Sequence, residues 1–373
     1  MKKMKILILT HYFQPHIGGI EIVAYNQAKE IVKRGHQVTI ITSKIGEEPE
    51  EEIIDGIKVK RVKAWNFFED RFGIAFPVFS LNLFSVLKEE IKNKDVIHIH
   101  GVWCMPSLLG AFIAKLYNKK LIITEHVGVV QTKSFLVTGI QKVIFYFFGR
   151  SMLQYSNKII VYNEKVGNWI NKKDKTIFLI NGVDISIFKP ATIKAKKKIK
   201  IKYGLPFSKK LVLFVGRLTE KKGFDKLFEA RDKDYLILFI GSGIVPENMK
   251  KDKNVLFLDP MLQEGLAEIY QASDIFCLPS KSEGFPLSIQ EAMVSGLPII
   301  TTDHPGYEDY LDRKYVKLIN PTPKFIKNTL REVLNDEVLI KKMKSYSRNT
   351  AVEKFSWEKN VTELIKIYKQ ILT

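Results

Sequence analysis

The stretch Ser280–Ile300 holds two glutamates, Glu283 and Glu291, eight residues apart around a Gly-Phe-Pro turn and with no basic residue between them. Carboxylates accept hydrogen bonds, and sugar and ribose rings offer vicinal hydroxyl groups as donors. Pro286 suits the first turn of a helix, which places Glu291 one to two turns inside that helix. Glu283 stays in the preceding loop, where capping of the helix is an alternative role. The spacing therefore indicates a site for hydroxyl-rich rings.

Two cations occupy a similar place earlier in the chain. In "VGRLTEKKGFD", Arg217 follows an apolar strand and a glycine, and Lys222 precedes Gly223 and a helix. The planar guanidinium fork and the lysine point charge together suit a diphosphate. The alternative is that both are surface charges at a sheet edge. In "FIGSG", Gly241 and Gly243 allow a close backbone approach or merely form a turn.

Glycines and histidines mark further candidate positions. Gly18 and Gly19 open the first helix in "GGIE", and a helix N-terminus attracts anions, although the pair could also be structural. His126 ends the apolar run "LIITEH", at the rim where ligands of parallel sheets bind. Three other histidines are candidates for contact with a second substrate or for loop stabilisation: His11, His16 and His100.

These side chains depend on parallel strands to position them. Apolar runs followed by helix-like stretches recur from "KILIL" to "KIIVYN", halt near residue 185 and resume from "LVLFVGR" to "LPIITT". This alternation is typical of parallel strands with crossover helices. We predict an α/β fold of two doubly wound, Rossmann-like domains that face a central cleft. The expected parts are 1–185, a linker at 186–205, 206–355, and a helix at 356–373 that packs back on the N-terminal domain.

Composition narrows the class of protein. The net charge is +19, with 59 Lys and Arg against 40 Asp and Glu. A lysine-rich surface explains this charge as well as attraction to an anionic partner does, and no nucleic-acid-binding module is recognisable. Cys104 and Cys277 lie far apart and the basic start lacks a signal-peptide core, so we expect a reducing, cytoplasmic location.

The motifs as a set resemble the retaining family-four glycosyltransferases of GT-B fold. "EGFPLSIQE" is similar to their E-x7-E motif. "GGIE", "RGHQVTIIT", "DVIHIHG", "NGVD", "GRLTEKKG", "GSG" and a closing "FSWE" helix follow the family's order along nearly the whole chain. The resemblance implies a nucleotide-diphosphate-sugar donor in the C-terminal domain, and an acceptor, a glycan or lipid-linked molecule, in the N-terminal domain. Surface polysaccharide or glycolipid synthesis is the expected context.

The resemblance also implies roles for individual residues. Glu291 would hold the donor ribose, Glu283 would contact the transferred sugar, and Arg217 and Lys222 would neutralise the diphosphate. His126 would meet the donor sugar and serve catalysis. Same-face displacement, without a protein nucleophile, metal or cofactor, is the implied mechanism. Further donor contacts are expected from Gly284, Phe285, Pro286, Leu287, Gly18, Gly19 and Gly241.

One segment departs from the family pattern. Many relatives have a Gly-Gly pair after the strand that follows E-x7-E, whereas "TTDHPGYEDYL" has Pro305 at the first glycine. A proline removes a backbone donor and restricts φ, so sugar contacts from this loop are in doubt. The competing interpretation of the whole chain is a non-catalytic sugar-nucleotide-binding protein.

Two apolar stretches of the N-terminal domain, Phe72–Leu87 and Phe135–Leu153, carry aromatic residues beside Lys and Arg. Both are too short or too interrupted to span a bilayer. Such composition suits a helix in a lipid interface, at the inner face of an anionic membrane. Buried crossover helices are the equally weighted alternative.

Overall fold

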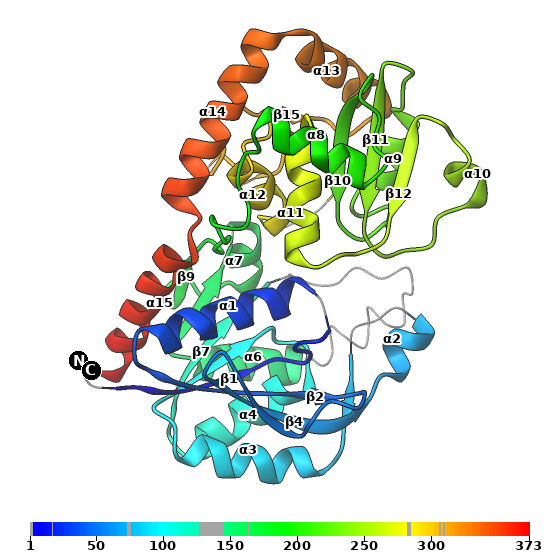
Figure 1. The fold of residues 1–373 in the computed structure, drawn as a ribbon. Helices are drawn as coiled ribbons and strands as arrows, with labels where there is room; N and C mark the ends of the chain where they lie inside the picture. Colours follow the sequence, from blue (N-terminus) through cyan, green and yellow to red (C-terminus); the bar gives the residue numbers. More distant parts are fainter. Residues whose placement is uncertain are drawn as a thin grey trace. The chain divides into compact units, whose positions relative to one another are not determined.

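The computed structural model describes residues 3–16, 18–72, 76–126, 145–162, 164–281, 285–305, 307–308 and 310–373. The chain forms two compact units, coloured along the sequence in Figure 1. Unit 1 comprises Met1–Gly182 and Trp357–Thr373, and unit 2 comprises Val183–Ser356. Each unit has its own sheet.

The sheet of unit 1 has mostly parallel strands. Its bounds are β1 (Lys5–Leu9), β2 (Gln37–Lys44), β3 (Glu51–Ile54), β4 (Ile57–Trp65), β5 (Val78–Phe79), β6 (Val96–His100), β7 (Lys120–Thr124), β8 (Lys158–Val161) and β9 (Thr176–Phe178). The order is β3-β4-β2-β1-β6-β7-β8-β9, and β5 pairs with β4. Only β3 and β5 run antiparallel to their neighbour within the described strands. The winding reverses between β1 and β6, which makes their carboxyl ends a topological switch point.

Apolar residues cover both faces of this sheet because successive side chains of a strand point to opposite faces. Leu7, Leu9 and Ile99 belong to the core beneath α3, α4, α6 and α7. Ile6 and Ile8 belong to the core beneath α1 and α15. The helices of unit 1 are α1 (Gly19–Lys33), α2 (Phe67–Phe72), α3 (Asn82–Lys92), α4 (Met105–Leu116), the π-helix η1 (Phe145–Gly149), α6 (Arg150–Tyr155), α7 (Glu164–Ile170) and α15 (Trp357–Leu372).

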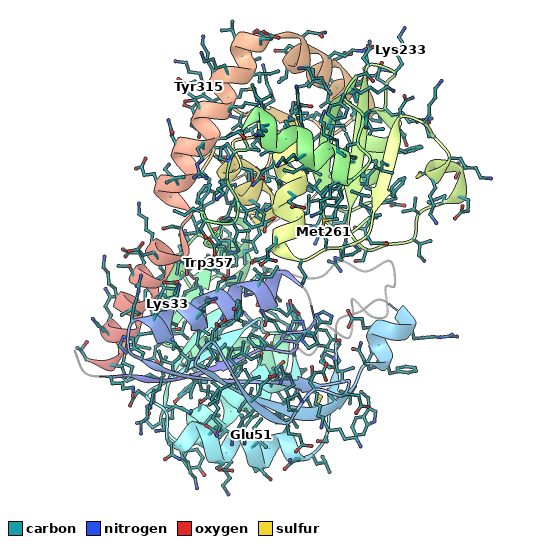
Figure 2. The ribbon with its side chains drawn as sticks, in the orientation of Figure 1. Lys33, Glu51, Lys233, Met261, Tyr315 and Trp357 are labelled. Atoms are coloured by element: carbon teal, nitrogen blue, oxygen red, sulfur yellow. The ribbon has the colours of Figure 1, made fainter. Side chains whose placement is uncertain are left out.

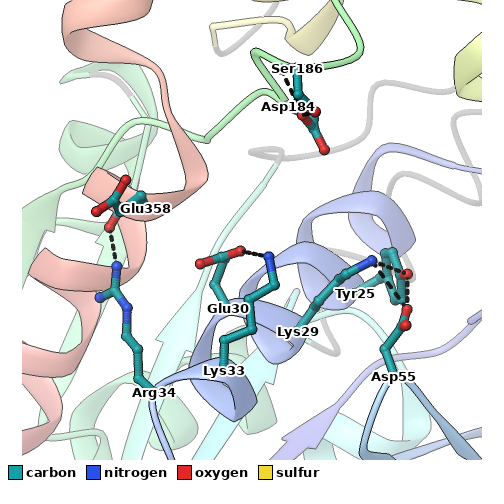
Figure 3. Close-up of polar contacts among 9 residues, drawn as sticks. All are labelled: Tyr25, Lys29, Glu30, Lys33, Arg34, Asp55, Asp184, Ser186 and Glu358. Carbon is teal, nitrogen blue, oxygen red and sulfur yellow. Dashed lines mark hydrogen bonds and ion pairs between the residues drawn. The ribbon is translucent and has the colours of Figure 1, made fainter.

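The C-terminal helix α15 is part of unit 1. Its Asn360 accepts a hydrogen bond from Gln27 of α1 at 3.0 Å, and Arg34, which caps α1, donates to the Glu358 carbonyl oxygen at 2.6 Å. Figure 3 shows the latter contact beside the surface pair Lys29–Asp55. Trp357, labelled in Figure 2, lies against Gly182 where the chain enters and leaves the unit. The first and last segments of unit 1 are therefore packed together although 174 residues of unit 2 separate Gly182 from Trp357.

Unit 2 has a six-stranded parallel sheet. Its strands are β10 (Lys210–Val215), β11 (Tyr235–Ile240), β12 (Val255–Leu258), β13 (Ile275–Leu278), β14 (Ile299–Thr302) and β15 (Lys317–Ile319). The order β12-β11-β10-β13-β14-β15 is that of a Rossmann sheet, with its switch point between β10 and β13. The helices are α8 (Ile193–Lys202), α9 (Phe224–Glu229), α10 (Glu247–Lys250), α11 (Gln263–Ala272), α12 (Leu287–Val294), α13 (Pro323–Asn335) and α14 (Glu337–Lys354).

The stretch 186–205, predicted as a linker, is instead an integral part of unit 2. It contains helix α8, whose N-cap Thr192 accepts a hydrogen bond from the Ala195 amide. Lys196 of α8 binds the Asp274 carboxylate at 2.6 Å. Lysine-rich composition suggested a solvated connection, but Lys196 finds a partner beside β13 that is distant in the sequence.

Candidate functional site

Four loops meet at the carboxyl edge of the unit 2 sheet, and hydrogen bonds join them. The Leu218 amide after β10 donates to Ser242 O after β11 at 2.8 Å. The Lys281 amide after β13 donates to Lys221 O at 2.8 Å. The loop after β14 adds His304, whose Nε2 lies 2.9 Å from Ser280 O. These contacts span the switch point, where parallel sheets bind ligands.

Glycines allow this close approach. A Cβ at Gly241 would lie 2.0 Å from Gly216 O, and one at Gly223 would lie 2.0 Å from Pro279 O. Gly223 also has φ of +76°, in the left-handed region. A Cβ at Gly243 would lie 2.8 Å from Leu218 O. Predicted glycines Gly241 and Gly243 are thus required for loop packing, whatever they do for a ligand.

The two predicted cations lie at this edge. Arg217 directly follows Gly216 and its side chain is exposed. Lys222 is half-buried, and its side chain lies close to Gly216: a Cβ placed on that glycine would be 3.7 Å from Lys222 Cδ. Both cations therefore belong to one loop beside the switch point, which suits a diphosphate.

Glu291 is the fifth residue of α12, as the position of Pro286 predicts, and it is buried with 6% of its surface exposed. Tyr270 of α11 donates a hydrogen bond to its Oε2 at 3.0 Å. Burial raises the pKa of Glu291 to about 7. The carboxyl group therefore gives up its proton near neutral pH, and a ligand that donates to the ionised form favours that form.

The rest of the E-x7-E segment divides into two parts. Glu283 and Gly284 lie outside the residues that the structure describes. The side chain of Phe285 is buried, with ring centroids 4.7 Å from Tyr310 and 5.4 Å from Phe355. Phe285 is therefore a core residue whose side chain anchors the loop. Pro286 caps α12 and Leu287 begins it.

A second group of polar side chains occupies the carboxyl edge of the unit 1 sheet. His11 follows β1, His100 ends β6, His126 follows β7 and Tyr162 follows β8. His100 Nδ1 lies 3.0 Å from His126 Nε2, and the His126 ring lies 5.2 Å from that of Tyr162. Burial lowers the pKa of His100 to about 3 and that of His126 well below its usual range. These two histidines are therefore neutral at physiological pH.

His16 has the opposite electrostatic environment. Its Nδ1 lies 3.3 Å from Glu21 and its Nε2 lies 3.4 Å from Glu69. The hydrogen bond with Glu21 is the main cause that raises the pKa of His16. His11, by contrast, has its pKa lowered by burial. The pKa values of the two histidines that precede the glycine loop are thus shifted in opposite directions.

The glycine loop itself brings a carboxylate to the start of α1. A Cβ at Gly18 would lie 2.3 Å from Glu21 Oε2, so the Glu21 side chain folds back over this glycine. A Cβ at Gly19 would meet no atom within 4 Å. An anion at this helix N-terminus would have to approach Glu21, which makes Gly18 and Gly19 weaker candidates for phosphate binding than the loop of unit 2.

Several residues that contribute to these edges were not predicted. Tyr270 holds Glu291, and His304 holds the loop after β13. Glu125, fully buried, accepts a hydrogen bond from the Val102 amide at 3.0 Å. The position of His304 directly after an apolar strand was a usable signal, whereas Tyr270 looks like an ordinary apolar-face residue of a helix. Within the described ranges, no group of three His, Cys, Asp or Glu side chains is arranged to hold a metal ion.

Comparison with known proteins agrees with this architecture. Residues 17–187 match the family model "Glycosyltransferase Family 4", and residues 195–350 match "Glycosyl transferases group 1". These matches indicate a GT-B glycosyltransferase of the group 1 family. An uncharacterised glycosyltransferase of Methanocaldococcus jannaschii is 26% identical, with 98% of each chain covered.

Two further comparisons extend the range of similar glycosyltransferases. The N-acetyl-alpha-D-glucosaminyl L-malate synthase of Bacillus anthracis is 24% identical over 99% of this chain and 98% of its own. Among solved structures, Anabaena HepE in complex with UDP and glucose has a TM-score of 0.79 at 16% identity. That match covers 98% of this chain and 100% of the HepE chain. The last similarity shows that this glycosyltransferase has the GT-B fold.

Proposed function

We propose that this glycosyltransferase transfers a sugar from a nucleotide-diphosphate sugar with retention of anomeric configuration. The observation that carries the proposal is the meeting of the Arg217–Lys222 loop with the loops after β11, β13 and β14 at one switch point. A diphosphate bound there gains charge-assisted hydrogen bonds from both cations. The same cations stabilise the negative charge that develops on the leaving group.

The two carboxylates are proposed to bind different parts of the donor. Glu291, buried and with a pKa near neutrality, accepts hydrogen bonds from the ribose hydroxyls of the donor. Glu283 contacts the transferred sugar, and Gly284, Phe285, Pro286 and Leu287 are proposed to make further contacts with the donor. His126 of unit 1 meets the sugar. The proposed mechanism uses no protein nucleophile. The acceptor oxygen attacks the anomeric carbon of the sugar on the face from which the phosphate departs. An oxygen of that phosphate takes the proton of the acceptor.

UDP is the first nucleotide to test, because the similar Anabaena protein was solved with it. The donor is tested as a panel, since similar structures were solved with UDP and with ADP. The acceptor is a glycan or a lipid-linked molecule. The name of the Bacillus anthracis relative, N-acetyl-alpha-D-glucosaminyl L-malate synthase, adds a small hydroxy acid to the acceptors worth testing.

The case for a lipid-linked acceptor comes from the surface of unit 1. The stretch Phe72–Leu87 buries Leu83 and Leu87 of α3 but exposes Leu81 and Phe84, and the described part of Phe135–Leu153 buries Met152 and Leu153 of α6. The exposed apolar residues of α3 and its N-cap, α4 and η1, here called the apolar helix surface, are Leu81, Phe84, Phe112, Leu116, Tyr146, Phe147 and Phe148. Within the described ranges, every helix is too short or too polar to cross a bilayer. We propose that the apolar helix surface lies in a lipid interface instead.

The test of the activity is nucleotide release. The protein is incubated with UDP-, GDP- and ADP-linked sugars and a mixture of glycan, lipid-linked and hydroxy-acid acceptors, and free nucleotide is quantified. Thermal-shift measurements with UDP, GDP and ADP identify the base, because binding stabilises the folded state by mass action. NMR of the product gives its anomeric configuration, and inversion would contradict retention. A nucleotide that binds tightly without turnover for any acceptor would favour the non-catalytic alternative.

A further inference from the structure

The two histidines at the edge of unit 1 form a pair, of which His100 is fully buried and His126 is half-buried. β6 and β7 are parallel neighbours, and His100 is in register with Thr124, two residues before His126. The imidazole rings of His100 and His126 are 5.2 Å apart at their centroids, tilted by 31°, with Nδ1 of His100 3.0 Å from Nε2 of His126. One ring must donate this hydrogen bond and the other must accept it.

The neighbouring histidine on β6, His98, is an example of a buried ring in which both nitrogens have a hydrogen-bond partner. His98 Nδ1 lies 2.7 Å from Tyr368 Oη, and His98 Nε2 lies 2.7 Å from Thr124 Oγ1, so both its nitrogens are bonded. His100 is also fully buried, but its Nε2 has no hydrogen-bond partner among the described residues. The hydrogen bond between His100 and His126 can run in either direction, and the two arrangements differ in whether this unpaired nitrogen carries a hydrogen.

In the first arrangement His100 carries its hydrogen on Nδ1, donates to His126 Nε2, and leaves a bare lone pair at its own Nε2. In the second arrangement His126 donates, and His100 leaves a buried N–H group without an acceptor. Buried N–H groups without a partner are rarer in proteins than unpaired acceptors. The first arrangement is therefore favoured, and it obliges His126 to carry its hydrogen on Nδ1.

The surrounding charges do not reverse this choice. Burial keeps both rings neutral, and His11 and His98, which face them, carry no stabilising negative charge. The buried Glu125 carboxylate is engaged by the Val102 amide, and Glu21 and Glu69 are engaged by His16. Tyr162 and Tyr368 contribute neutral rings, because burial holds the pKa of each well above 10.

We propose that His100 is a positioning residue: its Nδ1–H group fixes the orientation of the His126 ring and holds His126 in the Nδ1–H tautomer. His126 then presents a hydrogen-bond donor, not a base, at Nδ1. The tautomer follows from the geometry of unit 1 alone, whereas its use on a sugar oxygen rests on the proposed function. A donor suits a reaction in which the leaving phosphate takes the acceptor proton.

The test is long-range ¹H–¹⁵N NMR of the full-length protein labelled at histidine, without ligand, between pH 6 and pH 8. We expect His100 and His126 each to show a protonated Nδ1 and an unprotonated Nε2 across this range. H126Q identifies the His126 signals. An Nε2–H tautomer at His126, or a doubly protonated ring at pH 7, would overturn the proposal irrespective of activity.

Two substitutions at position 100 extend the test. In H100N the amide hydrogens lie near the place of Nδ1–H, so His126 is expected to keep its tautomer. In H100L the donor is lost, and the His126 signals are expected to shift toward the Nε2–H form. H98L removes a buried histidine of the same strand that has no hydrogen bond to His126, and should leave the His126 signals in place. If H98L shifts them as much as H100L does, packing and not the hydrogen bond controls the tautomer.

The link to catalysis is read separately. If nucleotide release is detected for the wild-type protein, H100L is expected to lower kcat by at least about tenfold with an unchanged KM for the donor, and H100N to restore part of it. A protein with the predicted tautomer but no turnover would contradict the proposed function and leave the positioning role intact. Equal loss in H100L and H100N would contradict the positioning role.

Discussion

At the scale of single residues, the Arg217–Lys222 loop makes the most direct prediction. R217A and K222A are each expected to weaken binding of the donor nucleotide by roughly 1.5–3 kcal/mol, the range for a hydrogen bond to a charged group. Neither change should unfold the protein, because Arg217 is exposed and Lys222 is half-buried. Isothermal calorimetry with the nucleotide found by thermal shift measures the loss.

The control for this pair is another cation of unit 2. K233A removes a positive charge beside Asp232, on the loop before β11 and hence at the opposite edge of the sheet. It should leave nucleotide affinity unchanged. Equal affinity in R217A, K222A and the wild-type protein would place the diphosphate elsewhere.

The buried Glu291 is predicted to lower the stability of the folded protein when it is ionised, although the ionised form is the one that binds the donor. Its pKa in the folded protein, about 7, is above the ordinary value of 4.5. The folded state therefore binds the proton more tightly than the unfolded state, and stability falls as pH rises from about 4.5 to about 7. At pH 8 the cost of the buried carboxylate reaches about 3 kcal/mol.

E291Q removes this cost. We expect the variant without ligand to have a higher Tm than the wild-type protein at pH 8 and an equal Tm at pH 4.5, while its nucleotide affinity falls most at pH 8, where the wild-type carboxylate is ionised. Differential scanning calorimetry and titration calorimetry check the two halves. A variant destabilised at pH 8 would show that the bond from Tyr270 contributes more to folding than burial of the carboxylate costs, and an unchanged nucleotide affinity would contradict the binding role of Glu291.

At the scale of elements, the segment after β9 packs closely against the start of α15 in unit 1, and this contact is here called the join. A Cβ at Gly182 would lie 2.5 Å from Trp357 Cα, so a side chain there forces the backbone of α15 to shift. G182A is expected to lower the free energy of unfolding of unit 1 by about 1–3 kcal/mol, the usual cost of overpacking.

G19A is the matched control, because a Cβ at Gly19 meets nothing within 4 Å and alanine favours a helix. Urea unfolding followed by tryptophan fluorescence compares the two variants, since Trp357 itself reports on the join. If G182A is as stable as G19A, the chain accommodates a methyl group at the join without loss of stability, which would contradict the prediction.

At the scale of the whole molecule, the net charge of +19 and the apolar helix surface predict salt-dependent binding to anionic vesicles. Each lysine or arginine near the lipid contributes roughly 1 kcal/mol, so the protein should sediment with anionic vesicles at low salt and less at high salt. F147S/F148S should reduce sedimentation more than tenfold, because these two side chains supply apolar area that lipid would bury.

The control is F207S/F325S, which removes two exposed phenylalanines of unit 2 that lie outside the apolar helix surface. It should sediment like the wild-type protein. A wild-type protein that stays in the supernatant with both anionic and neutral vesicles at low salt would defeat the membrane proposal. A wild-type dimer that F147S/F148S converts to a monomer would show that a second copy covers this surface.

Most of the fold followed from local patterns in the sequence. Strand and helix alternation predicted the parallel sheets, because buried strands and crossover helices differ in period and length. The positions of Arg217 after β10 and of Glu291 inside α12 also followed from strand ends and Pro286. Packing between segments that are distant in the sequence was harder to predict. Residues 186–205 were predicted as a linker, but Lys196 of α8 forms an ion pair with Asp274.

The properties that matter for chemistry were decided by tertiary structure. Burial beside Tyr270 sets the pKa of Glu291, and no local pattern reports burial that comes from another helix. His100 and His126 are 26 residues apart and become a hydrogen-bonded pair only because β6 and β7 are neighbours in the sheet. The sequence by itself determined which residue types stand at the carboxyl ends of strands, because the residues that follow each apolar run can be read directly along the chain. Only the order of the strands, which packing of the whole unit selects, decided which of those residues meet.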